Sequence, residues 1–196
     1  MKNTASFRRR GPLDLEKRSR IVQALAVAAG ILLLTLASWI EVPMVPVPMT
    51  MQTFAVLLVG CLYGWRLGAL TVAAWLAFAA LGLPLLAGGA GGIARFAGPT
   101  AGYLFAFPLA AAMAGWLASR GWMEGFLSAT AAMLLGHAVC LGLGTGWLAL
   151  AIGPERAVAA GLLPFLAGAA LKSVLVAAVV LLLPRAGTRQ RSAGVS

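Results

Sequence analysis

Residues 21–40 read IVQALAVAAGILLLTLASWI, twenty mostly apolar positions without a charged side chain. A helix rises about 1.5 Å per residue, so this run would span about 30 Å, which is the thickness of the hydrocarbon core of a bilayer. It therefore predicts a transmembrane helix. Further apolar runs predict helices over residues 54–63, 67–83, 101–118, 125–152 and 161–183. We expect an all-α integral membrane protein with six transmembrane helices.

The composition supports this fold class. The chain has 196 residues, of which 61% are hydrophobic and 10% are charged. Soluble domains are about 45–50% apolar and about 25% charged, so a soluble globular protein and a disordered one are both excluded. The expected organisation is a basic tail over residues 1–20, one membrane domain over residues 21–183, and a second basic tail over residues 184–196.

The basic residues predict the orientation of the helices. The net charge is +10, and most Lys and Arg residues flank the apolar runs. Six crossings put both termini on one side, where positive charge marks the cytoplasm. That side takes the following basic residues: Lys2, Arg8, Arg9, Arg10, Lys17, Arg18, Arg20, Arg66, Arg120, Arg185, Arg189 and Arg191. Arg95 and Arg156 fall on the outer side, and Lys172 lies inside an apolar run.

Two loops on the outer side are unusual. The first carries Pro43, Pro46 and Pro48, which cannot continue a helix, and its apolar side chains predict that it folds back over another part of the protein. The second spans residues 84–100 and is too rich in glycine to form a spanning helix. Irregular backbone at membrane depth is tolerated only where protein or a water-filled cavity satisfies it. We expect structured, outward-facing loops.

Three ionisable side chains are candidates for function. Arg95 is the only charged residue of the glycine-rich loop, and its planar guanidinium suits a carboxylate; alternatively, it lies in a flexible connector. Lys172 lies within an apolar run, where a lysine is costly, which favours a ligand contact or a proton site; Glu41 and Glu155 are outer-side candidates to pair with it. His137 either relays protons or hydrogen-bonds to a neighbouring helix.

The sequence offers no catalytic set. Gly142, Gly144 and Gly146 lack the spacing of a dinucleotide-binding loop, and Lys172-Ser173 lacks the glycines of a P-loop. Neither paired carboxylates nor a nucleophile elbow is present. The two cysteines, Cys61 and Cys140, lie in apolar runs and outside any Cys/His cluster, so we expect buried hydrophobes and no metal site. We therefore expect a protein that is not an enzyme.

Five short motifs occur in a fixed order along the chain. They are PVPMTMQ at residues 46–52, GLP at 82–84, AGGAGG at 87–92, GPTAGY at 98–103 and PFLAGAALK at 164–172. Together they resemble the BioY family, the biotin-specific S components of energy-coupling factor (ECF) vitamin transporters. The resemblance covers about residues 21–183, nearly the whole chain.

The resemblance implies a function and partners. It implies a substrate-capture domain in the bacterial cytoplasmic membrane that binds biotin with high affinity on its outer face, without a cofactor. It also implies a transmembrane coupling subunit and two cytoplasmic ATPases as partners, with small residues of the first helix, Ala24 and Ala28, contacting the coupling subunit. The alternative is a proton-coupled secondary transporter of a small carboxylate-bearing vitamin that needs no ATPase.

The resemblance also implies site residues. Those that match its motifs are Thr50, Gln52, Gly98, Pro99, Thr100, Tyr103 and Lys172. Either Arg95 or Lys172 would hold the carboxylate of biotin. Ala169 stands where the family has an aspartate that accepts hydrogen bonds from the ureido group. Another acceptor must replace it, such as a backbone carbonyl of the glycine-rich loop, Gln52 or Thr100.

Overall fold

The computed structural model describes residues 13, 15 and 18–183. Most of the tail expected over residues 1–20, and all of that expected over residues 184–196, lies outside the described residues. The elements, in chain order, are α1 (Arg20–Trp39), β1 (Glu41–Val42), β2 (Met49–Thr50), α2 (Gln52–Tyr63), α3 (Trp65–Ala80), the 3₁₀ turns η2 (Ala87–Gly89) and η3 (Ile93–Phe96), α4 (Ala101–Ser119), the 3₁₀ turn η4 (Trp122–Glu124), α5 (Phe126–Ile152), α6 (Pro154–Ala157), the π-helical turn η5 (Val158–Leu162) and α7 (Leu163–Leu182).

Six main helices occur at the predicted places, with two corrections at their ends. The break expected at residues 64–66 is limited to Gly64, whose φ of 85° favours glycine, and α3 begins at Trp65. Gly153-Pro154-Glu155-Arg156 predicts a turn, and the chain does turn there, but only Gly153, with φ 87° and ψ 154°, leaves the helical path. Pro154 occupies the first turn of α6, where its missing N–H costs nothing, and α6 continues through η5 into α7.

Four helical segments of the described chain are long and apolar enough to cross a membrane: Arg20–Trp39, Ala101–Ser119, Phe126–Ile152 and Pro154–Leu182. The other two predicted spans, α2 and α3, have 12 and 16 residues. At about 1.5 Å per residue, α2 is about 18 Å long, less than the hydrocarbon core of a bilayer. Six crossings therefore remain a prediction.

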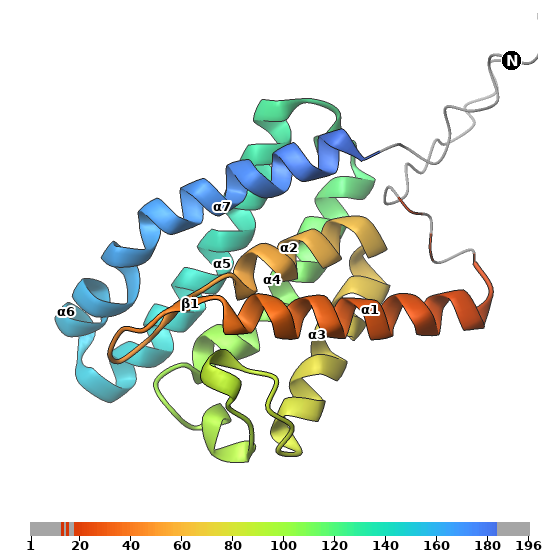
Figure 1. The fold of residues 1–196 in the computed structure, drawn as a ribbon. Coiled ribbons are helices and arrows are strands. Elements are labelled where there is room, and N and C mark those ends of the chain that lie inside the picture. Colours follow the sequence, from red (N-terminus) through yellow and green to blue (C-terminus); the bar gives the residue numbers. More distant parts are fainter. Residues whose placement is uncertain (1–12, 14, 16–17, 184–196) are drawn as a thin grey trace, which may run out of the picture.

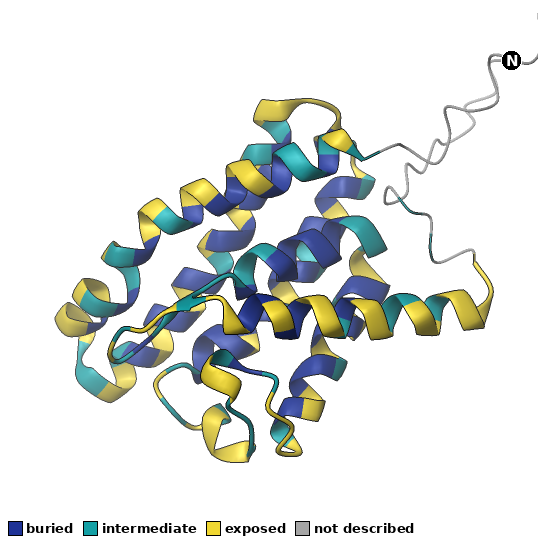
Figure 2. Cartoon of the chain, viewed as in Figure 1, coloured by how far each residue is buried: buried dark blue, intermediate teal, exposed yellow. Residues whose placement is uncertain are grey.

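The helices run back and forth between two ends of the molecule (Figure 1). One end carries the start of α1, the α2–α3 junction, the α4–α5 junction and the end of α7, while the β1–β2 hairpin, the glycine-rich loop and α6 lie at the other. The apolar side chains Leu25, Leu32 and Leu36 of α1 are exposed, and exposed positions continue along the outer faces of the helices (Figure 2). This distribution suits lipid around the bundle.

Helix α4 is the centre of the bundle and is more buried than the other three long segments. Its small residues let neighbouring backbones approach closely. A Cβ on Gly115 would lie 2.6 Å from the carbonyl oxygen of Gly60, and a Cβ on Gly60 would lie 2.3 Å from that of Ala111. These glycines therefore let α2 pack closely against α4, which sets the position of α2.

Both loops, the proline loop and the glycine-rich loop, are ordered by contacts with helices. The proline loop joins β1 to β2, which pair antiparallel with Glu41 opposite Thr50. The glycine-rich loop is held at its start, where the Trp39 indole donates to the carbonyl of Pro84 (3.3 Å), and near its end, where the Trp147 indole donates to that of Gly98 (3.1 Å). The expectation of structured loops is therefore confirmed by these contacts.

Candidate substrate-binding site

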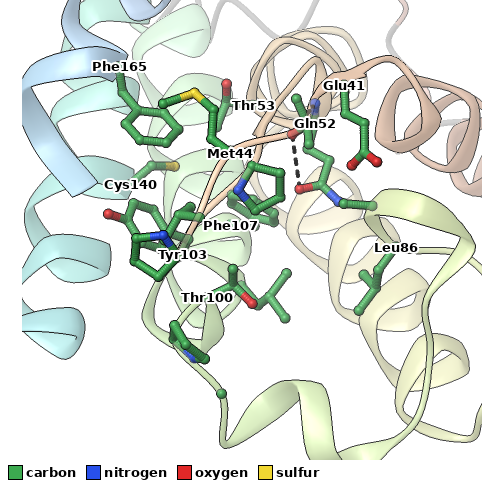
Figure 3. Close-up of a pocket in the computed structure, with 18 of the residues that line it drawn as sticks. Glu41, Met44, Gln52, Thr53, Leu86, Thr100, Tyr103, Phe107, Cys140 and Phe165 are labelled. Carbon is green, nitrogen blue, oxygen red and sulfur yellow. Dashed lines mark hydrogen bonds between the residues drawn. The ribbon is translucent and has the colours of Figure 1, made fainter. Parts of the chain in front are cut away.

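A cavity of about 730 Å³ lies between the two loops and helices α2, α4, α5 and α7 (Figure 3). Every site residue expected from the sequence lines it: Thr50, Gln52, Arg95, Gly98, Pro99, Thr100, Tyr103 and Lys172. These residues come from three separate stretches of the chain, at residues 50–52, 95–103 and 172. The structure therefore brings all eight predicted residues together around one space.

The apolar part of the wall was not predicted residue by residue. It includes Met44, Leu86, Phe107, Cys140 and Phe165 (Figure 3). Helical spacing was the available signal, because residues three, four and seven apart share one face of a helix. Phe107 follows Tyr103 by one turn, and Phe165, Ala169 and Lys172 form such a stripe on α7.

The start of α2 presents a fixed amide to the cavity. Gln52 is 6% exposed, and its Nε2 donates to Ser38 Oγ at 3.1 Å. The Thr50 hydroxyl donates to Gln52 Oε1 and accepts the backbone N–H of Gln52, both at 3.2 Å. A carbonyl oxygen has two lone pairs, so Gln52 Oε1 retains one for a ligand.

Lys172 contributes a buried positive charge. Its side chain is 9% exposed and lines the cavity. Its ammonium donates to the backbone carbonyl of Thr50 at 3.0 Å, which ties α7 to the hairpin. The ammonium has three N–H donors, and no carboxylate in the described part of the chain forms an ion pair with it. Neither Glu41 nor Glu155 therefore pairs with Lys172, and two donors remain for a ligand.

Arg95 provides the second cation. It lies in η3 at the rim of the cavity, is exposed to solvent, and makes no ion pair with another described residue. Gly98 and Pro99 follow it and complete the loop, and Thr100 leads into α4. The two predicted carboxylate-binding residues thus differ in their surroundings, because Lys172 is buried and Arg95 is open to water.

Tyr103 has a structural contact that was not predicted. Its hydroxyl donates to the carbonyl of Gly161 at 2.7 Å and lies 3.4 Å from Thr145 Oγ1. Its ring lies 6.3 Å from that of Phe165. A Cβ on Gly144 would lie 2.1 Å from the tyrosine ring. The hydroxyl therefore holds the π-helical turn η5 through the carbonyl of Gly161, and Tyr103 also lines the cavity.

His137 hydrogen-bonds to neighbouring helices, one of the two interpretations left open by the sequence. Its Nε2 lies 3.1 Å from Thr53 Oγ1 on α2, and its Nδ1 lies 2.9 Å from Ser173 Oγ on α7. Nδ1 also lies 3.1 Å from the carbonyl of Met133. His137 lines the cavity and joins three helices there, and both of its ring nitrogens are already engaged.

Both cysteines are free and buried, as expected for small hydrophobes. Within the described ranges, no group of three or more His, Cys, Asp and Glu side chains is placed to hold a metal ion. Ala169 lines the cavity one turn before Lys172 and offers no side-chain acceptor there. Glu41, considered from sequence only as a partner for Lys172, also lines the cavity.

The small-residue pair expected to contact a partner, Ala24 and Ala28, lies on an exposed part of α1. The pair Ala26 and Gly30, displaced by two positions, faces the bundle instead. The Tyr63 hydroxyl donates to the carbonyl of Ala26 at 2.8 Å, and a Cβ on Gly30 would lie 2.7 Å from Thr71 Cγ2. Ala24 and Ala28 are thus free for an external contact.

Comparisons with known proteins agree with one another. The family model described as "BioY family" matches residues 9–189. The chain is 39% identical to a probable biotin transporter BioY of Pyrococcus horikoshii, over 71% of this chain and 82% of that protein. It is 35% identical to the biotin transporter BioY of Thermotoga maritima, over 81% of this chain and 95% of that protein.

A solved structure is also similar to this one. It is the crystal structure of the S-component for biotin from an ECF-type ABC transporter. The TM-score is 0.66 and the sequence identity is 28%, and the match covers 82% of this chain and 87% of the other. Since the family model spans nearly the whole sequence and the fold agrees, the chain belongs to the BioY family.

Proposed function

We propose that this protein binds biotin with high affinity and takes it up as the S component of an ECF transporter. The observation that carries the proposal is the convergence of the eight predicted residues on one cavity. Relatives in the family are named biotin transporters, which makes transport, and not catalysis, the activity to test.

The cavity suits the chemistry of biotin. Its volume of about 730 Å³ falls within the about 300–1,000 Å³ of small-ligand sites. The fused rings of biotin are largely apolar and match the walls formed by Leu86, Phe107 and Phe165. The carboxylate of biotin needs a cation, and Lys172 and Arg95 are the two cations of the cavity.

The proposal includes the arrangement in the membrane and the partners. Six crossings with both termini in the bacterial cytoplasm would place the cavity on the outer side, where biotin arrives. A transmembrane coupling subunit would contact the α1 surface around Ala24 and Ala28, and two cytoplasmic ATPases would supply energy. The arrangement is supported by Figure 1, in which the α2–α3 and α4–α5 junctions, which carry Arg66 and Arg120, lie at the end opposite the two loops.

The alternative, a proton-coupled carrier, depends on Lys172 and His137. Both ring nitrogens of His137 are engaged by protein groups on α2, α5 and α7, which favours a structural role over proton relay. We therefore give this alternative second place.

Two measurements test the proposal. Isothermal titration of the purified protein with biotin tests capture, and no heat at micromolar biotin would refute it. Uptake of labelled biotin by cells tests the energy source. Loss of uptake on ATP depletion supports the ECF mechanism, whereas uptake that survives ATP depletion and collapses with a protonophore supports the alternative.

A further inference from the structure

The cavity contains a carboxylate to which no role has been assigned. Three charged side chains line it: Glu41, Arg95 and Lys172. Glu41 is the only acid among the described residues of the wall, and it forms no ion pair with either cation. Both signs of charge are therefore present in one space without neutralising each other. Such a cavity suits a ligand that is anionic at one end and carries N–H donors at the other.

The hairpin fixes the direction of the Glu41 side chain. Glu41 pairs with Thr50 across the two strands, and the N–H of Met51 donates to the carbonyl of Ile40 beside this pair at 3.0 Å. Directly opposed residues of an antiparallel pair project on the same face. Glu41 therefore shares a face with Thr50, whose hydroxyl contacts Gln52 Oε1, and Figure 3 shows both Glu41 and Gln52 at this end of the cavity.

The glycine-rich loop leaves the Glu41 carboxylate open. A Cβ on Gly88, whose φ is 64°, would lie 3.4 Å from Glu41 Oε1, so a larger side chain at this position would crowd the carboxylate. Glu41 is half-buried, and its carboxylate makes no hydrogen bond with another residue of the described part. Its oxygens are therefore free to accept from a ligand where the hairpin meets the glycine-rich loop.

We infer that Glu41 determines specificity by accepting a hydrogen bond from a ureido N–H of biotin while a cation of the cavity holds the carboxylate of biotin. The inference rests on the proposed function. A carboxylate is a stronger acceptor than an amide or a carbonyl, and Ala169, beside Lys172, provides no acceptor.

A charged analogue tests this role. In 2-iminobiotin a guanidine replaces the urea and is protonated at neutral pH, so one ring N–H and the exocyclic N–H form a fork that fits a carboxylate. Glu41→Gln keeps the size and an acceptor but removes the charge. We expect Glu41→Gln to lower the affinity for biotin about tenfold and the affinity for 2-iminobiotin about 100-fold. The ratio of the two dissociation constants should therefore change about tenfold. Glu155→Gln, on the exposed helix α6 and outside the cavity, is the matched control and should leave both affinities unchanged.

The outcomes separate the inference from the proposed function. If the unmodified protein binds biotin and Glu41→Gln weakens both ligands equally, Glu41 only supports the hairpin and the inference fails alone. If Glu41→Gln raises the affinity for biotin, the Glu41 carboxylate repels the ligand and the inference also fails. If the unmodified protein does not bind biotin, both fail. A selective loss of 2-iminobiotin, unaffected by Glu155→Gln, supports the role.

Discussion

The ammonium of Lys172 donates a hydrogen bond of 3.0 Å to the backbone carbonyl of Thr50, 122 residues earlier in the chain. The contact joins α7 to the hairpin that carries the proline loop over the cavity. One side chain is thus both a candidate ligand for a carboxylate and a support of the loop that covers the site. If a ligand carboxylate binds this ammonium, occupancy of the cavity would affect the position of the hairpin through Lys172.

Replacing Lys172 should weaken the binding of biotin strongly. Lys172→Ala removes a buried cation, and a hydrogen bond to a charged group is worth about 1.5–3 kcal/mol, or about 10- to 100-fold in affinity. Lys172→Met, which keeps the apolar stem, should lose a similar amount. Isothermal titration with biotin and with biotin methyl ester measures the effect. If Lys172 holds the carboxylate, the preference for acid over ester disappears in both variants; a preserved preference would assign the carboxylate elsewhere.

Arg95→Ala should have a smaller effect that depends on salt. Arg95 is exposed, and the interaction of exposed charges is screened over about 10 Å at 0.1 M salt. We expect at most about a tenfold loss of biotin affinity at low salt and a smaller loss at high salt. Titrations at two salt concentrations check this. If Arg95→Ala and Lys172→Ala both bind biotin normally, the cavity is not the biotin site.

The positions of the helices were largely predictable from apolar runs, whereas their ends were not. Residues 153–156 predicted a turn of four residues, yet the turn is limited to Gly153, because a proline in the first turn of a helix is favourable and α6 begins at Pro154. Seven of the eight site residues could be predicted because they match motifs of the BioY family, and Arg95 could be predicted because it is the only charged residue of the glycine-rich loop. The hydrogen bonds from Lys172 to Thr50 and from Tyr103 to Gly161 could not be predicted from the sequence. Each depends on how helices that are distant in the sequence pack together.

Tyr103→Phe should lower the stability of the protein and leave its affinity for biotin unchanged. The Tyr103 hydroxyl holds the carbonyl of Gly161, and its loss should reduce the free energy of unfolding by about 0.5–1.5 kcal/mol. The ring, which faces Phe165, is retained. Thermal unfolding in detergent, with and without biotin, measures both effects. An unchanged melting temperature together with a large loss of biotin affinity would show instead that the hydroxyl contacts the ligand.

Two glycines of α5 provide a matched pair. A Cβ on Gly144 would lie 2.1 Å from the Tyr103 ring, whereas nothing lies within 4 Å of a Cβ on Gly142. Gly144→Ala should therefore destabilise the protein by about 1–3 kcal/mol through overpacking. Gly142→Ala should be neutral or stabilising by up to about 1 kcal/mol, because alanine favours a helix. Equal melting temperatures for the two variants would contradict the packing of Tyr103 against α5.

The exposed small residues of α1 predict a variant that separates binding from transport. Ala24 and Ala28 lie four residues apart on an exposed part of α1, where small side chains let another helix approach closely. Ala28→Leu should leave biotin affinity unchanged, since Ala28 lies outside the cavity wall, but reduce co-purification with a coupling subunit and abolish uptake. Ala73→Leu, at an exposed alanine of α3, is the control and should preserve both. If Ala28→Leu supports normal co-purification and uptake, the coupling subunit contacts a different surface.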